Sequence, residues 1–369
     1  MKIMTVLGTR PEIIRLNLLI KKLDHYGDHV LVHTGQNYAP SLNEIFFKDL
    51  SLRKPDYFLE VRGESFGEQL AQIVSGAEKV LLKERPDRVV VLGDTNSGLV
   101  AIVAKRMGIP VFHLEAGNRC YDDRVPEEIN RRIIDHSSSV LMPYTHRSKE
   151  NLLREGIERS RIHVIGNPIY EVLETYGDAI NRSDVHSRLR VEPKKYFLVT
   201  LHRAENVDDE ARLGRLLSAL DALGRKHQLG VICSLHPRTK NRMKTFGFSE
   251  SGGPTLFIEP LGFTDFVALE KGALCVLTDS GTVQEECCIF RVPNVTVRDV
   301  TERPETIESG SNILTGSGPD RIVGCVDVAL TEDRDWERPA EYLDRHVSSK
   351  VVKILMGYER FEQPENRPL

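Results

Sequence analysis

Residues 113–131, HLEAGNRCYDDRVPEEINR, join the end of an apolar strand to the start of a charged helix. The strand is predicted over residues 111–114, and Glu115 follows it directly. A carboxylate at the end of a buried strand needs a partner or a function, so Glu115 is a candidate active-site residue. In an open parallel sheet, the crevice beyond the carboxyl ends of the strands is the usual ligand site. The stretch therefore predicts an α/β sheet with chemistry at this strand end.

The helix predicted to begin at Pro126 has two interpretations. Proline at the first position and acidic residues behind it are typical of an ordinary helix start, because acids there favour the helix dipole. Alternatively, Glu127 and Arg131 bring a second carboxylate and a cation to the strand end that holds Glu115. Both interpretations stay open at this point.

Length and composition limit the class of protein. A chain of 369 residues predicts two domains, each with its own core. With 50 basic and 54 acidic residues and a net charge of −4, the chain is not expected to coat a polyanion such as nucleic acid. No apolar run approaches the roughly 18 residues of a membrane span, and residues 1–8 lack a cleavage signal. We therefore expect a cytoplasmic protein without a membrane partner.

The six cysteines do not suggest a site. They form no CxxC motif and have no closely spaced histidines beside them, so neither a zinc site nor a redox motif is predicted. Reduced thiols are expected instead, and no metal is expected.

Strand-like runs alternate with amphipathic helical runs along the chain, which is typical of a parallel sheet covered on both faces. The pattern restarts after a polar stretch at residues 181–195. We predict two doubly wound, Rossmann-like α/β domains, residues 1–168 and 169–345, with the substrate in the cleft between them. A helix over residues 340–358 could carry the segment 346–369 back onto the first domain. The predicted strands are residues 2–7, 29–34, 88–92, 111–114, 140–142 and 162–165, then 196–201, 230–234, 255–258, 274–278 and 294–297.

Two further strand ends in the first half carry charged residues. Residues 8–12, GTRPE, lack the GxGxxG spacing of a dinucleotide loop, so no NAD cofactor is predicted. Gly8 and Pro11 only end a strand and start a helix, whereas Arg10 can point into a crevice with Arg15 supporting it one turn later. Asp94 follows the apolar run 89–92, so it is expected near Glu115. Its alternative role is to cap a helix that starts near residue 96.

The second half places histidines and a small-residue turn at its strand ends. His202 and His236 each follow a strand and precede an arginine closely, which favours ligand contact for the pair. Residues 278–286, TDSGTVQEE, are a strand, a turn and a helix start. Free N–H groups at Ser280, Gly281 and Thr282 make a ready phosphate site. Thr282 and Glu285 also fit a capping box.

Two other residues near this turn are candidates for nucleotide binding. Glu286 is not part of this capping box and is a candidate acceptor of hydrogen bonds from the ribose hydroxyls. Arg303 adds a cation suited to bidentate phosphate binding.

As a set, these stretches resemble the non-hydrolysing UDP-N-acetylglucosamine 2-epimerase family over nearly the whole chain. The resemblance implies a glycosyltransferase-B fold, with UDP held mainly by the second domain and the sugar facing the first. It also implies a UDP-sugar as substrate and a homodimer. The stretches are residues 8–12, 93–95, 113–117, 126–131, 202–206, 279–286 and 301–305. By resemblance, the nucleotide diphosphate is contacted by Arg10, His202, Ser280, Gly281, Glu286 and Arg303, and the catalytic group is Asp94, Glu115, Glu127, Arg131 and His202.

The chain departs from the GlcNAc-specific bacterial pattern at several positions, namely residues 36–38, Asn118 and Ala204. These departures put a second, regulatory UDP-GlcNAc site in doubt. Together with residues 43–47 and 118–120, they look more like the branch that converts UDP-2-acetamido-2,6-dideoxy-L-talose to UDP-N-acetyl-L-fucosamine for surface polysaccharides. The alternative substrate pair is UDP-GlcNAc and UDP-ManNAc.

The chemistry of C2 inversion accounts for the residue types. C2–H of an N-acetylhexosamine is not next to a carbonyl, so its loss must accompany cleavage of the C1–O bond to UDP, which leaves a glycal. Re-addition with protonation from the other face inverts C2, and this needs a base and an acid. A glycosyltransferase of the same fold, a hydrolysing epimerase and a non-catalytic sensor are the rivals, since fold alone does not separate them. The crowding of acids favours the epimerase.

Overall fold

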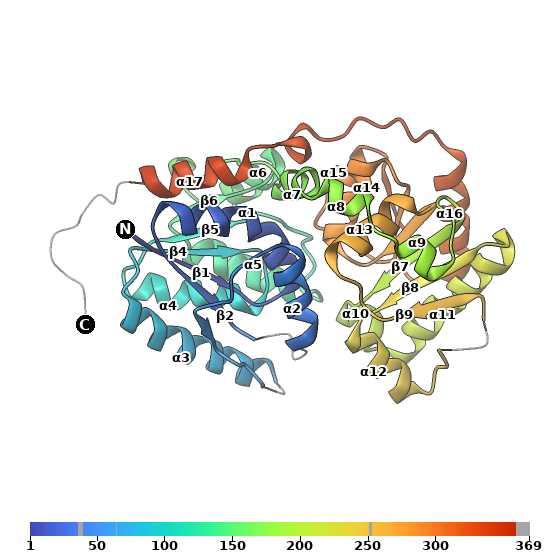
Figure 1. The fold of residues 1–369 in the computed structure, drawn as a ribbon, viewed down its shortest axis with the longest axis horizontal. Helices are drawn as coiled ribbons and strands as arrows, with labels where there is room; N and C mark the ends of the chain where they lie inside the picture. The colour runs from blue at the N-terminus through green and yellow to red at the C-terminus, as the bar shows by residue number, and fades with distance from the viewer. Residues whose placement is uncertain (36–39, 64, 251–252, 359–369) are drawn as a thin grey trace. The chain divides into compact units, whose positions relative to one another are not determined.

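The computed structural model divides the chain into two compact units, residues 1–174 with 341–369 and residues 175–340 (Figure 1). It describes residues 1–35, 40–63, 65–250 and 253–358. Each unit contains one parallel sheet of six strands. Within the described ranges, no helix combines the length and the apolarity that crossing a membrane requires.

The first sheet has the strand order β3-β2-β1-β4-β5-β6, which is the doubly wound Rossmann order. Its central strands are buried on both faces, since Val89, Val90 and Val91 are fully covered. Helices therefore lie against both sides of the sheet, as such apolar runs require. The strands are β1 (Lys2–Leu7), β2 (Asp28–His33), β3 (Tyr57–Phe58), β4 (Arg88–Leu92), β5 (Val111–Leu114) and β6 (Val140–Met142).

The second sheet repeats this order as β12-β11-β10-β7-β8-β9. Both units are thus Rossmann-like. In each, the strand order reverses between the first and fourth strands, β1 and β4 or β7 and β10. That reversal opens a crevice at the carboxyl ends, where ligands bind in this class of fold. The strands are β7 (Tyr196–Leu201), β8 (Gly230–Leu235), β9 (Thr255–Ile258), β10 (Cys275–Thr278), β11 (Asn294–Thr296) and β12 (Asn312–Leu314).

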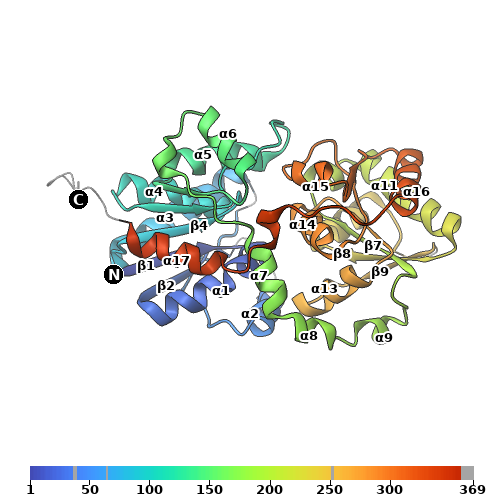
Figure 2. The same ribbon diagram turned by 90° about the horizontal axis from the view of Figure 1, so that it is seen from above.

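The helices connect successive strands and form the outer layers of each unit (Figures 1 and 2). In the first unit they are α1 (Arg10–Tyr26), α2 (Pro40–Asp49), α3 (Phe66–Glu84), η1 (Asn96–Leu99), α4 (Val100–Arg106), α5 (Pro126–Ser137), α6 (His146–Arg154), η2 (Arg159–Arg161), α7 (Pro168–Thr175) and, from the end of the chain, η3 (Ala340–Leu343) and α17 (Val347–Gly357). In the second unit they are α8 (Gly177–Asn181), α9 (Val185–Leu189), α10 (Ala204–Val207), α11 (Glu210–His227), α12 (Pro237–Phe246), α13 (Phe263–Gly272), α14 (Gly281–Phe290), α15 (Pro304–Glu308) and α16 (Pro319–Thr331).

Three details differ from the sequence-based predictions. The strand predicted over 162–165 is wrong, because only an isolated bridge joins Leu141 to Ile162 before the chain turns at Gly166. The edge strands β3 and β12, of two and three residues, were not predicted. The helix predicted over 340–358 is two pieces, η3 and α17. All six cysteines are free thiols.

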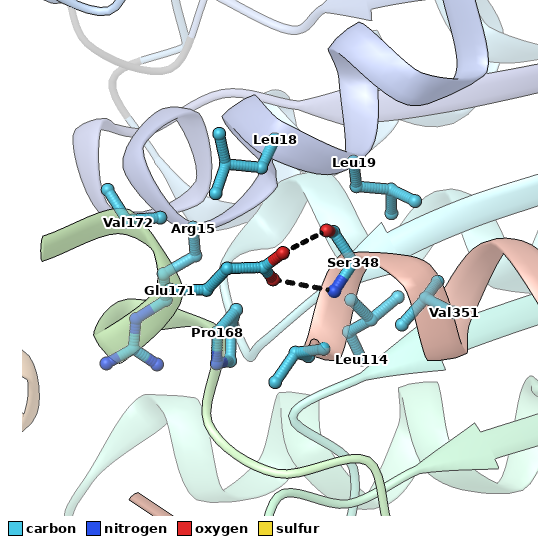
Figure 3. A pocket seen from close by; sticks show the side chains of 10 residues that line it. Arg15, Leu18, Leu19, Leu114, Pro168, Glu171, Val172, Ser348 and Val351 are labelled. Atoms are coloured by element: carbon cyan, nitrogen blue, oxygen red, sulfur yellow. Dashed lines mark hydrogen bonds between the residues drawn. The ribbon is translucent and has the colours of Figure 1, made fainter. Parts of the chain in front are cut away.

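The last helix, α17, lies beside α1 in the first unit, and α7 also belongs to this unit (Figure 2). The division therefore falls after residue 174 rather than at the predicted residue 168. Within the first unit, a small pocket is lined by side chains of α1, α7 and α17 (Figure 3). Glu171 of α7 accepts hydrogen bonds from the backbone N–H (2.8 Å) and the hydroxyl (2.5 Å) of Ser348. It therefore satisfies a free N–H group in the first turn of α17.

We expect Glu171→Ala to loosen α17 by about 1–2 kcal/mol, because it removes both hydrogen bonds and a negative charge from the first turn of the helix. Hydrogen exchange of the α17 amides, measured by mass spectrometry, should then accelerate by roughly 5- to 30-fold. Glu174→Ala is the matched control, since its ion pair with Arg345 is exposed on both sides and contributes little. Equal effects of the two substitutions would contradict this role of Glu171.

Candidate active site

The carboxylate of Glu115 lies at the end of β5 and forms an ion pair with a buried arginine. Nη1 of Arg15, on α1, lies 2.5 Å from Glu115 Oε2, and the exposed fractions of the two side chains are 1% and 8%. The Arg15 guanidinium also lies 5.5 Å from the Tyr144 ring centroid and points away from the Glu171–Ser348 contact (Figure 3). Glu115 has a φ of +66°, in the left-handed region that a non-glycine residue rarely adopts. Such strain is typical of functional positions.

Asp94 follows β4 and is held by a second buried arginine. Nη2 of Arg131, on α5, donates to Asp94 Oδ2 at 2.5 Å, while Nη1 donates to Glu128 Oε2 at 2.7 Å. Burial alone would raise the pKa of Glu128, but the backbone N–H of Cys120 and the charge of Arg131 lower it. Thr95, not Asp94, is the N-cap residue of η1, so the capping role weighed for Asp94 is wrong. Its partner is Arg131.

The strand ends that carry Asp94 and Glu115 lie next to each other, because Leu92 and Leu114 are paired in β4 and β5. A methyl group on Gly93, the residue before Asp94, would be 3.9 Å from Glu115 Oε2. Beneath them, His113 bridges Asp135 Oδ1 and the Gly93 carbonyl, each at 2.8 Å. The prediction that Asp94 and Glu115 neighbour each other therefore agrees with the structure.

The loop after β1 presents Arg10 at the same edge of the sheet. Burial lowers the pKa of Arg10, whose guanidinium lies 5.9 Å from the Phe46 ring centroid and pairs with no acid among the described residues. Glu12 fixes the loop by accepting hydrogen bonds from the N–H groups of Gly8 and Thr9. It also accepts from Thr95 Oγ1, and burial raises its pKa to about 7. The strand ends of β1 and β4 are thereby tied together.

In the second unit, His202 follows β7 and is oriented by Asp279, which follows β10. Asp279 Oδ1 lies 2.8 Å from His202 Nδ1, and the same carboxylate accepts the N–H groups of His202 and Arg203. Burial would raise the pKa of Asp279, but the charge and hydrogen bond of His202 hold it well below its usual range. Because Nδ1 of His202 is bound to Asp279, Nε2 is the ring nitrogen with which His202 can contact a ligand. The His236 ring lies 5.7 Å from it.

The small-residue turn at the start of α14 lies against Arg303. Ser280 is the N-cap residue, and a methyl group on Gly281 would be 3.4 Å from Arg303 Cζ. The capping box predicted for Thr282 and Glu285 is wrong, because Glu285 Oε1 instead accepts from Arg303 Nε at 2.5 Å. Glycine is needed here because a methyl group would lie only 2.7 Å from Glu302 Oε1. The turn and the arginine therefore lie side by side, and the buried carboxylates of Glu285 and Glu302 face the guanidinium.

The predicted residues fall into two sets, one in each unit. The first group contains Arg10, Arg15, Asp94, Glu115 and Arg131, with Glu127 half-buried in the first turn of α5. The second contains His202, His236, Ser280, Gly281, Thr282, Glu286 and Arg303, where Glu286 is buried on α14. Residues 36–38 lie outside the described residues.

Sequence reasoning missed the residues that hold these groups. They are Glu12, Glu128 and Asp279, all buried acids. The spacing of Glu128 and Arg131, one turn apart on α5, was the available signal for that pair. Asp279 follows an apolar strand just as Asp94 and Glu115 do. In the ranges that the structure describes, no three His, Cys, Asp or Glu side chains are grouped so as to hold a metal ion.

Comparison with known proteins gives the family. The family model described as UDP-N-acetylglucosamine 2-epimerase matches residues 21–356. The UDP-N-acetylglucosamine 2-epimerase of Methanocaldococcus jannaschii is 43% identical over 96% of this chain and 99% of its own length. The UDP-2,3-diacetamido-2,3-dideoxy-D-glucuronate 2-epimerase of Pseudomonas aeruginosa is 36% identical over 88% of this chain and 90% of its own.

Solved structures agree with this relationship. The M. jannaschii enzyme in complex with UDP-GlcNAc and UDP superposes with a TM-score of 0.93 at 42% identity, covering 97% of this chain and all of that one. The glycosyltransferase WaaG, at 12% identity and a TM-score of 0.60 over 97% of this chain and all of its own, shares the fold alone, which is of the glycosyltransferase-B type. The chain is an isomerase that belongs to the non-hydrolysing UDP-N-acetylglucosamine 2-epimerase family.

Proposed function

We propose that this enzyme inverts C2 of a UDP-N-acetylhexosamine by eliminating UDP and adding it back. A base removes the C2 proton, the C1–C2 double bond forms, and UDP leaves C1 with the electron pair. Addition of UDP to the resulting 2-acetamidoglycal, with protonation of C2 from the opposite face, gives the epimer. No redox cofactor is needed, since elimination followed by re-addition causes no net oxidation or reduction of the sugar.

The observation that carries this proposal is the pair of strand-end carboxylates, each bound to its own buried arginine. Two proton-transfer groups on neighbouring strands suit a reaction that removes a proton and returns it. Asp94 and Glu115, with Glu127 and His202, supply these groups. Arg15 and Arg131 fix the two carboxylates in place, which keeps the geometry of proton transfer constant.

The diphosphate is bound, in this proposal, by arginine side chains and backbone N–H groups. Arg303 and the turn at Ser280 and Gly281 bind it in the second unit, and His202 and His236 contribute to the same site. Arg10 adds a cation from the first unit. These groups stabilise the charge that develops on UDP as C1–O breaks.

For the sugar, the 43% identity to an enzyme named for UDP-N-acetylglucosamine favours UDP-GlcNAc and UDP-ManNAc as the substrate pair. A specific observation keeps the 6-deoxy-L-talo sugar as a second candidate. Asn118, one of the departures from the bacterial pattern, donates to Glu115 Oε1 at 3.3 Å and accepts from Ser148. The variant residue therefore touches the proposed catalytic group.

The rival functions use these residues less well. A glycosyltransferase needs a single base, so it leaves the second arginine-bound carboxylate without a role. A non-catalytic sensor would need Arg303 and the Ser280 turn but not Asp94 or Glu115. The homodimer and the cytoplasmic location stay predictions.

We expect turnover in D₂O to place deuterium at C2 of the product, without added NAD or metal, because the returning proton comes from a solvent-exchangeable acid. NMR of the purified enzyme with UDP-GlcNAc and with the 6-deoxy-L-talo substrate, in separate tubes, measures this and identifies the sugar. Full retention of the original C2 hydrogen would exclude elimination and addition.

Glu115→Gln and Asp94→Asn are each expected to lower epimerisation by at least about a hundredfold, since they keep the shape of the side chain but remove its acid or base capacity. UDP binding and folding should be retained. A variant that still breaks C1–O should accumulate UDP and a 2-acetamidoglycal, which mass spectrometry detects. Asp123→Asn, at a 69% exposed carboxylate of the same segment, is the control. Near-normal turnover of both variants would remove these carboxylates from the mechanism.

Arg303→Lys should weaken UDP binding by roughly tenfold, because it keeps a cation for the buried Glu285 but loses the guanidinium fork. Ser280→Ala should weaken binding less, since its N–H group remains. Calorimetry with UDP measures both, and Arg188→Lys, whose ion pairs with Asp184 and Asp265 are exposed or half-buried, is the control. Unchanged affinity in both variants would place the phosphate site elsewhere.

A further inference from the structure

A second buried carboxyl group lies behind Glu286, the proposed ribose-binding residue. Glu270 is on α13 and is fully buried, while Glu286 on the adjacent α14 is 4% exposed. The two carboxyl groups are in hydrogen-bonding contact. Nothing in the reaction outlined above uses Glu270, so its presence against Glu286 requires an explanation.

Among the residues that the structure describes, no cation is paired with Glu270. The Cys287 thiol donates to Oε1 at 3.3 Å, and Oε2 has no donor among the described residues. The nearby donors are committed elsewhere: Lys194 Nζ binds the carbonyls of Lys271 and Ala273, and the Tyr196 hydroxyl donates to the Leu269 carbonyl. Within the described ranges, Glu270 forms no ion pair.

Two buried carboxyl groups that touch repel each other when both are ionised, so one of them favours its protonated form. Burial raises the pKa of Glu270 well above its ordinary value, and the charge of Glu286 raises it further. Besides Glu286, the titratable group in contact with it is the Cys287 thiol, whose pKa burial also raises, so this thiol supplies no charge. The proton of the pair therefore resides on Glu270, the more buried member.

We propose that Glu270 is a positioning residue that, as a neutral carboxylic acid, donates a hydrogen bond to the Glu286 carboxylate and so orients Glu286 to accept the ribose hydroxyls of the nucleotide. This inference rests on the proposed function, in which Glu286 contacts UDP. An ionised carboxylate only accepts hydrogen bonds, so it matches two hydroxyl donors and distinguishes ribose from a sugar that lacks one of them. Glu270 thus sets nucleotide selectivity without touching the nucleotide.

The matched variants are Glu270→Gln and Glu270→Leu in the full-length protein. Both are uncharged and of similar size, but only glutamine can donate to Glu286. Calorimetry with UDP and with 2′-deoxy-UDP measures the selectivity, and circular dichroism confirms folding. We expect the unmodified enzyme and Glu270→Gln to prefer UDP by at least about tenfold, as loss of a hydrogen bond to a charged group implies, and Glu270→Leu to reduce the preference to about twofold or less. A purely structural role would not move this ratio.

Infrared spectroscopy tests whether the Glu270 carboxyl group is protonated, and it needs no nucleotide. The unmodified enzyme at neutral pH should show a protonated carboxylic acid carbonyl band that is absent from Glu270→Gln. Absence of that band, retained selectivity in Glu270→Leu, or lost selectivity in Glu270→Gln would each overturn the proposal. If the unmodified enzyme binds UDP and 2′-deoxy-UDP equally, the ribose contact of Glu286 is itself wrong and the positioning role falls with it. The infrared band still decides separately whether Glu270 holds the proton.

Discussion

The site in the first unit depends on two buried arginines that each hold a strand-end carboxylate, Arg15 with Glu115 and Arg131 with Asp94. A buried ion pair is weak evidence of a stabilising design, because well-packed apolar residues of similar volume often give equal or greater stability. Glu115 adds a left-handed backbone conformation to this cost. Two such pairs at one edge of one sheet are therefore better explained by chemistry than by stability.

The second unit also has an acidic residue at the end of a central strand, but this residue has different partners. Asp279 occupies the end of β10, where Asp94 occupies the end of β4, and both strands flank the reversal of strand order in their sheets. Asp279 turns inward and is satisfied by His202 and by backbone N–H groups, so it serves as a support. One topology thus places an arginine-bound acid in one unit and a histidine-orienting acid in the other. The side chains, not the fold, separate the two roles.

The sequence predicted the strand ends well but not the partners of the residues found there. Apolar runs such as 88–92 and 111–114 show where a buried strand stops, and the next charged residue is then a candidate. Arg15 was predicted to support Arg10, whereas it binds Glu115, which is 100 positions away in the chain. No local spacing encodes such a pair. The same limit explains Glu285, whose spacing from Thr282 fits a capping box although tertiary packing gives it to Arg303.

Buried acids inside helices are the hardest functional residues to find from a sequence. Glu270 follows Ala268 and Leu269 and precedes Lys271, so its place in α13 resembles an ordinary solvent-facing position. Only the packing of α13 against α14 shows that it faces Glu286. A charged residue removed from water without a cation must change its protonation state. Its chemistry is then set by the neighbouring carboxylate, and a carboxyl group that cannot ionise becomes a hydrogen-bond donor with a fixed direction.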